Sequence, residues 1–313
     1  MDILSIQNLK KSFKDMVAVD GLSLSIGEKE VHGILGPNGA GKSTTINCIL
    51  GLLEYDSGTV SFEDGKSSKK WSKNIGYVPQ DLAIYPELTP TENIQFFCSL
   101  YGFKGEELKN RTQRALEFVG LTEVKDKKAG EFSGGMKRRL NMACGIAHSP
   151  KLIIMDEPTV GIDPQSRNRI LENVRALNEA GATILYTTHY MPEIEEICNK
   201  ITVIDHGKVI ATGTKSDIMS RMGKDTELLI EFSEGKGNID QFVHQVSEFS
   251  DVHHIEQEKW ICKIRHPKNI VMIDKIIELT IKNQLSIQNI KNQEPSLEEI
   301  FLSLTGKELR DQK

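Results

Sequence analysis

A glycine-rich loop of the form Gly-x-x-x-x-Gly-Lys-Ser constrains this chain more than any other feature. The loop occupies residues 36–43 and continues into Thr44. The apolar run at residues 31–36 before it is typical of a buried strand, and a helical pattern follows it. A phosphate-binding loop requires this strand–loop–helix context. We therefore expect an α/β domain that binds a phosphate group at this loop.

The residue types of the loop suit an anionic ligand. Glycines let backbone N–H groups approach a phosphate, and the N-terminus of the following helix adds partial positive charge. The ammonium group of Lys42 can reach the β- and γ-phosphates of a nucleotide, and the Ser43 hydroxyl can bind Mg²⁺. The residues expected to hold the phosphates are Gly36, Pro37, Asn38, Gly39, Ala40, Gly41, Lys42, Ser43 and Thr44.

Two adjacent acids, Asp156 and Glu157, end a second apolar run that begins at residue 152. Neighbouring side chains of a strand point to opposite faces, so the two acids are expected to have different functions. Asp156 suits Mg²⁺ binding, and Glu157 suits a general base that polarises an attacking water. Alone, the pair could be two solvated acids at a strand end. The phosphate loop favours the functional interpretation.

The region up to about residue 213 alternates apolar runs with helical patterns, which is typical of an α/β fold with a parallel sheet. Buried strands are expected at residues 31–36, 75–80, 152–157 and 183–189. Antiparallel additions are expected at residues 59–64 and 201–210.

A helical insertion is expected at residues 81–130, because the pattern there predicts helices at 91–101 and 106–119 with no strong strand between them. Thr91 lacks a Glu three residues later, so no full capping box is expected at that residue.

A second domain is expected at residues 225–313. Its pattern predicts the order strand, helix, strand, strand, helix, strand, which suits a small α+β domain of the ferredoxin-like class. The expected elements lie at residues 227–232, 239–249, 252–256, 260–265, 270–282 and 285–290, with a final helix at 297–304.

Composition narrows the class of protein further. The net charge of −5 argues against a dedicated nucleic-acid binder. The five cysteines are scattered, which argues against a disulfide framework or a zinc site and fits a reducing compartment. No secretory signal is visible, and no apolar run reaches the roughly 20 residues that a membrane-spanning helix needs. If the chain works at a membrane, we expect a partner to hold it there.

A third motif, Phe-Ser-Gly-Gly-Met-Lys-Arg-Arg at residues 132–139, leads into a helical run. With all three motifs, the sequence from residue 1 to about 213 resembles the ATP-binding cassette (ABC) family. The resemblance implies a P-loop ABC ATPase domain at residues 1–215, with an antiparallel β subdomain and the helical insertion. ATP and Mg²⁺ are the implied cofactors. The signature loop of that family corresponds to Ser133, Gly134 and Gly135.

The resemblance implies roles for further residues that mean little alone. Gln80 resembles the glutamine that senses Mg²⁺ and water, and His189 resembles the switch histidine that contacts the γ-phosphate. Asp163, in Gly161-Ile162-Asp163, resembles the loop that communicates between subunits. Phe13 occupies the position of an aromatic ring that stacks on adenine, and Val19 is expected beside the base. Without the resemblance, each could be an ordinary structural residue.

The resemblance also implies partners. Two cassettes pair head to tail, so that Ser133 and Gly135 of one complete the site formed by Lys42, Glu157 and His189 of the other. A separate integral-membrane permease moves with them, which places the chain in the cytoplasm on the inner face of the cell membrane. The second cassette could be another copy of this chain or a related ATPase, and no nucleic-acid partner is implied.

One departure is Met136, where the family commonly has Gln. Because Ser and Gly supply the main phosphate contacts, hydrolysis should survive. The form of this motif resembles the drug-resistance and ABC-2-type exporter branch, which implies a drug, antibiotic or lipid-like cargo. The sequence at residues 295–301 resembles the closing helix of the accessory domain in that branch. The permease is expected to dock on apolar residues near 82–94.

Three other functions would each require sequence features that differ from those of this chain. A cassette ATPase that acts on ribosomes or DNA typically has two cassettes, a long coiled-coil insertion or a zinc hook, and none of these is present. A catalytically dead subunit would lack Lys42, Glu157 or His189. A GTPase would carry an Asn-Lys-x-Asp base reader, which is absent. Export rests on the branch resemblance, since the chemistry alone also allows import.

Overall fold

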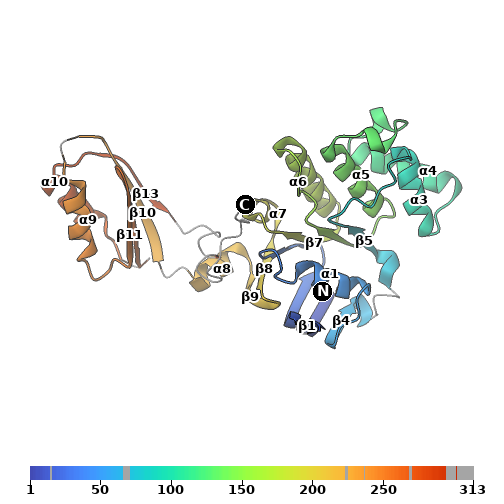
Figure 1. Cartoon of the computed structure of the whole chain (residues 1–313), viewed down its shortest axis with the longest axis horizontal. Helices are drawn as coiled ribbons and strands as arrows, with labels where there is room; N and C mark the ends of the chain where they lie inside the picture. The colour runs from blue at the N-terminus through green and yellow to red at the C-terminus, as the bar shows by residue number, and fades with distance from the viewer. Residues whose placement is uncertain are drawn as a thin grey trace. The chain divides into compact units, whose positions relative to one another are not determined.

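A computed structural model describes residues 1–14, 16–65, 71–222, 225–235, 237–267, 270–293 and 301. These residues divide into two compact units, Met1–Lys215 and Ser216–Gly306. Each unit has its own sheets and helices (Figure 1).

The first unit is built on a six-stranded sheet with the order β5-β6-β7-β3-β8-β9. Every residue of β3, β6 and β7 is buried, as expected of parallel strands covered on both faces. These strands are near-continuous apolar runs, which is why the sequence predicts them well. The strands are β3 (Val31–Leu35), β5 (Ile75–Val78), β6 (Leu152–Asp156), β7 (Thr183–Thr188), β8 (Lys200–Asp205) and β9 (Lys208–Gly213).

One strand prediction is wrong in direction. β8 was expected to be an antiparallel addition, but it pairs parallel with β3, with Thr202 opposite Ile34. The chain enters β8 from the helix α7 (Met191–Ile197), so β8 runs in the direction of the other crossover strands. Only β9 is antiparallel, because the tight turn at His206-Gly207 reverses the chain after β8.

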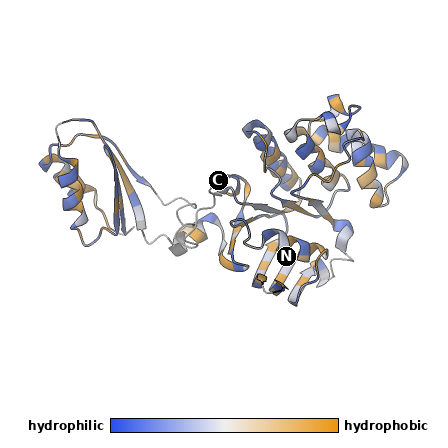
Figure 2. Ribbon diagram, in the orientation of Figure 1, coloured by the Kyte–Doolittle hydropathy of each residue, from blue (hydrophilic) through white to orange (hydrophobic). Residues whose placement is uncertain are grey.

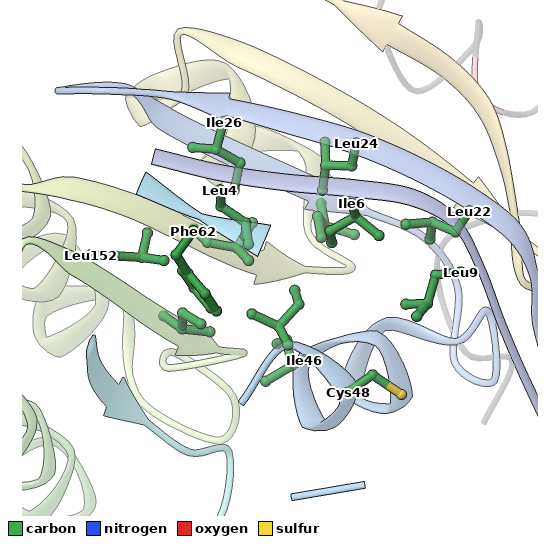
Figure 3. Packing of buried hydrophobic residues seen from close by; sticks show 14 of the residues in the cluster. Leu4, Ile6, Leu9, Leu22, Leu24, Ile26, Ile46, Cys48, Phe62 and Leu152 are labelled. Carbon is green, nitrogen blue, oxygen red and sulfur yellow. The ribbon is translucent and has the colours of Figure 1, made fainter. Parts of the chain in front are cut away.

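A three-stranded antiparallel sheet, β2-β1-β4, forms the subdomain expected from the sequence. Its strands are β1 (Asp2–Phe13), β2 (Met16–Gly27) and β4 (Ser57–Phe62). Side chains of these strands form one core with helix α1 (Lys42–Leu50) and with the six-stranded sheet. Figure 3 shows Ile46 of α1 among Leu4 and Ile6 of β1, Phe62 of β4 and Leu152 of β6. This core fixes the helix that follows the phosphate loop.

The helical region expected at residues 81–130 is present. It contains α3 (Pro90–Leu100) and α4 (Gly105–Phe118), which are followed by α5 (Gly134–Ile146). Helix α3 begins with a full capping box that the sequence analysis missed: the Thr89 hydroxyl accepts from the Glu92 N–H, and the Glu92 side chain accepts from the Thr89 N–H. Pro90, one of the residues near 82–94 expected to be partly exposed for docking, is instead the buried first residue of the helix.

The second unit contains a four-stranded antiparallel sheet with the order β11-β12-β10-β13, the helices α9 and α10, and all but the first residue of α8 (Lys215–Met222). The element order is the one that the sequence predicts, and the ferredoxin-like assignment stays a prediction. Hydrophobic and hydrophilic residues alternate along both helices, as expected of helices with one buried face (Figure 2). The elements are β10 (Asp225–Phe232), α9 (Ile239–Ser247), β11 (His254–Glu258), β12 (Ile261–Pro267), α10 (Ile273–Lys282) and β13 (Ile287–Gln293). Of the final helix expected at 297–304 and of the motif at 295–301, only Phe301 lies within the described residues.

Candidate functional site

The phosphate loop joins β3 to α1 in the strand–loop–helix arrangement that the motif requires. Asn38 and Gly39 at its tip are exposed, while Gly36 and Ala40 are buried. Gly41, the N-cap of α1, has a left-handed backbone with φ 102°, and a Cβ there would collide with the Ala18 carbonyl. Only glycine fits this position. The exposed tip leaves the loop open to an anion.

Lys42 lies at the centre of the site with 5% of its surface exposed. Its Nζ donates to the carbonyl oxygens of Gly36 at 2.8 Å and Pro37 at 3.2 Å. The same nitrogen lies 3.0 Å from Glu157 Oε1. The lysine therefore fixes the backbone at the start of the loop and places a positive charge beside the acid.

Glu157 connects Lys42 to His189. Its Oε2 lies 3.1 Å from His189 Nδ1, and only 4% of the residue is exposed. Burial alone would raise the pKa of Glu157, but the hydrogen bond from His189 and the charge of Lys42 outweigh it and hold the pKa below its ordinary value. Glu157 is therefore ionised, which the polarisation of a water requires.

The backbone of Glu157 is unusual, with a left-handed φ of 45°. Its N–H points at Thr187, 3.1 Å from the carbonyl oxygen and 3.1 Å from the hydroxyl. Non-glycine residues in this conformation are strained and occur often at functional sites. Because Glu157 lies beyond the last residue of β6, strand alternation no longer directs its side chain, and the acid turns to Lys42.

Asp156 has different partners, as the sequence analysis expected of the two acids. Its Oδ1 accepts a hydrogen bond of 2.6 Å from the Thr187 hydroxyl, and the exposed Ser43 side chain also hydrogen-bonds to it. Burial raises the pKa of Asp156, against the opposing effect of these two hydrogen bonds. The acids thus meet two consecutive residues of the loop: Asp156 meets Ser43, and Glu157 meets Lys42.

Gln80 lies two residues beyond the end of β5 and is exposed. Its carbonyl oxygen accepts a hydrogen bond from Arg138, whose other terminal nitrogen donates to the Val160 carbonyl at 3.0 Å. Arg138 belongs to α5, the helix that follows the signature loop. This arginine, which the sequence analysis left without a role, ties Gln80 to the loop that follows β6.

The signature loop begins α5, with Ser133 as its N-cap: the Ser133 hydroxyl accepts from the Met136 N–H at 3.3 Å. Ser133 and Gly134 are exposed and Gly135 is buried, with Ser166 so close that a Cβ at Gly135 would collide with it. Asp163 caps α6 (Pro164–Glu179) by accepting from the Ser166 N–H at 2.9 Å. The structure therefore brings the signature loop beside the loop of Asp163.

The two residues expected at the adenine differ in exposure. Phe13 is 44% exposed at the end of β1, and the Lys11 Nζ lies 5.3 Å from its ring centroid, so the ring is accessible for stacking. Val19 is fully buried in the core between the sheets. This burial argues against the predicted contact between the Val19 side chain and the base, since the residue has no exposed surface to offer.

The donor set fits Mg²⁺ only together with a phosphate. Among the described residues no group of three His, Cys, Asp or Glu side chains could hold a metal ion. The exposed Ser43 hydroxyl and the neighbouring Asp156 carboxylate are oxygen donors of the kind that Mg²⁺ prefers. Mg²⁺ is commonly bound by one or two protein groups plus substrate phosphates.

One buried acid near the site was missed. Glu193 of α7 has 1% of its surface exposed and accepts hydrogen bonds from two hydroxyl groups. The signal that could have found it is position: Glu193 lies on the same helix face as the buried Ile197, four residues later. An acid within an apolar helix face requires partners.

Comparison with known proteins places the chain in a family. The model of the ABC transporter family matches residues 19–160. The chain is 44% identical over 314 residues to the linearmycin resistance ATP-binding protein LnrL of Bacillus subtilis (strain 168), covering 99% of this chain and 100% of that protein. The chain belongs to the ABC transporter ATP-binding family. Cassettes of this family are ATPases. The P-loop ABC ATPase fold predicted from the sequence is confirmed.

Other relatives agree with this assignment. The chain is 34% identical over 310 residues to the Nod factor export ATP-binding protein I of Rhizobium sp. (strain N33), covering 98% of each protein. A solved ATP-binding subunit of an ABC transporter covers 71% of this chain and 93% of its own, with a TM-score of 0.64 and 29% identity. A cassette solved in its ADP conformation covers 69% of this chain and 92% of its own, with a TM-score of 0.61 and 33% identity.

Proposed function

We propose that this cassette hydrolyses ATP for an exporter of drug, antibiotic or lipid-like cargo, and that it drives a separate membrane permease. The observation that carries the proposal is a series of contacts beside the phosphate loop, from the buried Lys42 through the buried Glu157 to the half-buried His189. The relatives support export, since they are named for linearmycin resistance and for Nod factor export.

In the proposed mechanism each group of the site has one task. The loop N–H groups and Lys42 bind the phosphates of ATP. Glu157 accepts a proton from the attacking water as a general base, and His189 orients the γ-phosphate. Ser43, Gln80 and Asp156 would hold Mg²⁺, which when bound neutralises charge on the transferred phosphoryl group.

The decisive experiment is Glu157→Gln. The variant keeps the size of the side chain and loses its negative charge, so we expect ATP to bind while hydrolysis falls by about 100-fold or more, within the range of general-base catalysis. ATPase rate and nucleotide affinity should be measured on the same preparation. Glu172→Gln is a matched control, because Glu172 is an exposed acid on α6. A Glu157→Gln variant that turns over at the wild-type rate would remove the general base from the proposal.

Pairing of two cassettes is the second part of the proposal. A solved cassette in a post-hydrolysis state with ADP and Pi is dimeric, and it is 27% identical to this chain with a TM-score of 0.62, covering 67% of this chain and 98% of its own. In a head-to-tail dimer the exposed Ser133 would face the phosphates held by Lys42 of the other copy. Glu157→Gln with ATP should therefore accumulate as a dimer, measurable by light scattering, and Lys42→Ala should not.

The permease is proposed to dock beside α3. Leu82, Tyr85 and Phe96 are each more than a third exposed, and the Tyr85 ring lies 5.1 Å from that of Phe96. Clustered apolar side chains of this kind mark binding surfaces. No helix within the described ranges is long and apolar enough to cross a membrane. We propose that docking holds the cassette on the inner face of the cell membrane.

Affinity capture with tagged Glu157→Gln protein and ATP tests the partner. The expected result is a polytopic membrane protein recovered from native membranes, and Tyr85→Ser should reduce its recovery. Recovery of ribosomal or DNA-bound proteins without a membrane partner would favour the alternative, a cassette ATPase that acts on ribosomes or DNA.

A further inference from the structure

Glu193 is a buried carboxylate joined to both chain segments that carry the Glu157–His189 pair. Its Oε1 accepts a hydrogen bond of 2.7 Å from the Thr159 hydroxyl. Its Oε2 accepts a hydrogen bond of 3.0 Å from the Tyr186 hydroxyl. A carboxylate in a dry site is costly unless it is paired and hydrogen-bonded, and here both of its oxygens are satisfied.

Arg167 supplies the countercharge. Its Nε lies 3.4 Å from Glu193 Oε1, and its guanidinium carbon lies 4.6 Å from the centroid of the Tyr190 ring. Arg167 is in the first turn of α6, four residues after Asp163. Its backbone N–H donates a hydrogen bond to the Asp163 carbonyl oxygen. The carboxylate is therefore also connected to the helix that Asp163 caps.

The positions of these partners along the chain are informative. Thr159 follows Glu157 by two residues, and Tyr186 precedes His189 by three. Glu193 itself follows His189 by four residues, in α7. One buried carboxylate thus connects the segment that bears Glu157 to the segments on both sides of His189.

We propose that Glu193 is a positioning residue for ATP hydrolysis. Its carboxylate fixes the loop after β6 relative to α7, so that Glu157 Oε2 and His189 Nδ1 meet at 3.1 Å. The inference rests on the proposed roles of Glu157 and His189. Displacing a catalytic group by about 1 Å can cost roughly 100-fold in rate, so a remote carboxylate can control turnover without touching the substrate.

Steady-state kinetics of the full-length protein test the proposal. Glu193→Gln removes the charge that Thr159 and Arg167 bind, and Thr159→Val removes one hydroxyl donor. We expect kcat to fall by about 10-fold or more in both, with the KM for ATP unchanged, because the hydrogen bonds of Lys42 to the Gly36 and Pro37 carbonyls are not altered. Thr159→Ser keeps the hydroxyl and should restore kcat. A double variant Glu193→Gln/Thr159→Val should lose no more than the stronger single variant.

Glu196→Gln is the matched control. Glu196 lies on the same helix but is exposed, and it pairs with Arg175 of α6 at 2.6 Å, so it links the same two helices from the solvent side. We expect its kcat to equal that of the wild type. All rates should be measured well below the unfolding temperature of each variant. If Glu193→Gln does not fold, Thr159→Val and Tyr186→Phe, which each remove one hydroxyl that donates to Glu193, carry the test.

The outcomes separate the two proposals. Wild-type kcat in both Glu193→Gln and Thr159→Val, with hydrolysis lost in Glu157→Gln, would overturn the positioning role and leave the proposed function intact. An equal loss in Glu196→Gln would assign the effect to helix docking and also overturn the positioning role. Wild-type turnover in Glu157→Gln would instead remove the catalytic pair on which the inference rests.

Discussion

His148 shows how burial sets the chemistry of a single residue. The ring is 5% exposed and stacks on Tyr101, with the ring centroids 3.6 Å apart. Its Nε2 lies 3.0 Å from the Ile75 carbonyl, which requires a proton on Nε2, while Nδ1 is buried without a partner. Burial lowers the pKa of His148 to about 4, assisted by the charge of Arg111 and opposed by the hydrogen bond to Ile75. A second proton on Nδ1 would be buried without an acceptor.

This residue predicts a pH dependence of stability. The folded pKa lies below the unfolded value of about 6.5, so protons favour the unfolded chain, and stability is lost as the pH falls from 6.5 towards 4. Between pH 7 and pH 5 the contribution of His148 should fall by roughly 2 kcal/mol. Urea unfolding at both pH values measures the loss. His148→Gln should make this loss smaller, and an equal loss in the variant would contradict the role of His148.

Motif residues were predictable because their chemistry is local. Lys42 and Ser43 lie in one loop, and Asp156 and Glu157 end one strand, so spacing alone places each pair. Arg138 was not predictable, because its partners Gln80 and Val160 come from distant parts of the chain and are backbone carbonyls, which carry no sequence signal. Glu193 was missed for a related reason: its partners are common hydroxyl residues.

At the scale of elements, the buried strands and the helices α3, α4, α9 and α10 were predicted, and the two long strands β1 and β2 were not. No strand was expected at β1 or β2. The alternation of β1 breaks between Ile6 and Leu9, where the register with β2 shifts and Asn8 adopts a φ of 46°. Such a bulge moves later side chains to the other face, so the pattern of period two is lost.

The capping box of α3 gives a prediction at this scale. Thr89→Ala removes the side-chain acceptor of the Glu92 N–H, and we expect it to lower the free energy of unfolding by about 1 kcal/mol. Thr89→Ser keeps the hydroxyl and should remain within a few tenths of the wild type, about 0.3 kcal/mol. Chemical denaturation of the three proteins compares them. Equal losses in both variants would show that the hydroxyl is not what stabilises the helix.

On the scale of the whole molecule, the burial of the cysteines shows how well the interior is packed. None of the five is in a disulfide, and Cys48, Cys98, Cys144 and Cys262 are buried. Burial raises the pKa of the Cys262 thiol to about 12 and raises the pKa values of Cys144 and Cys198 further. A buried thiol that stays protonated is a poor nucleophile.

We therefore expect the native protein to react slowly with a thiol reagent at pH 8, and all five thiols to react after unfolding in guanidinium. The absorbance of the thiolate that the reagent releases gives the number of cysteines that react and the rate of their reaction. One fast thiol in the native protein would contradict the packing around that cysteine.

The two units have separate hydrophobic cores, one around Leu4 and Ile46 and the other around Ile230 and Phe242. Within the described part of the chain, the two clusters have no residue in common. Substitutions that share no partner residues usually add in their effect on stability instead of amplifying one another. Mutations can therefore accumulate in the second unit, during divergence of the gene or in the laboratory, while the ATP-hydrolysing unit keeps its own margin of stability. The sequence of one unit can therefore diverge while the sequence of the other is kept.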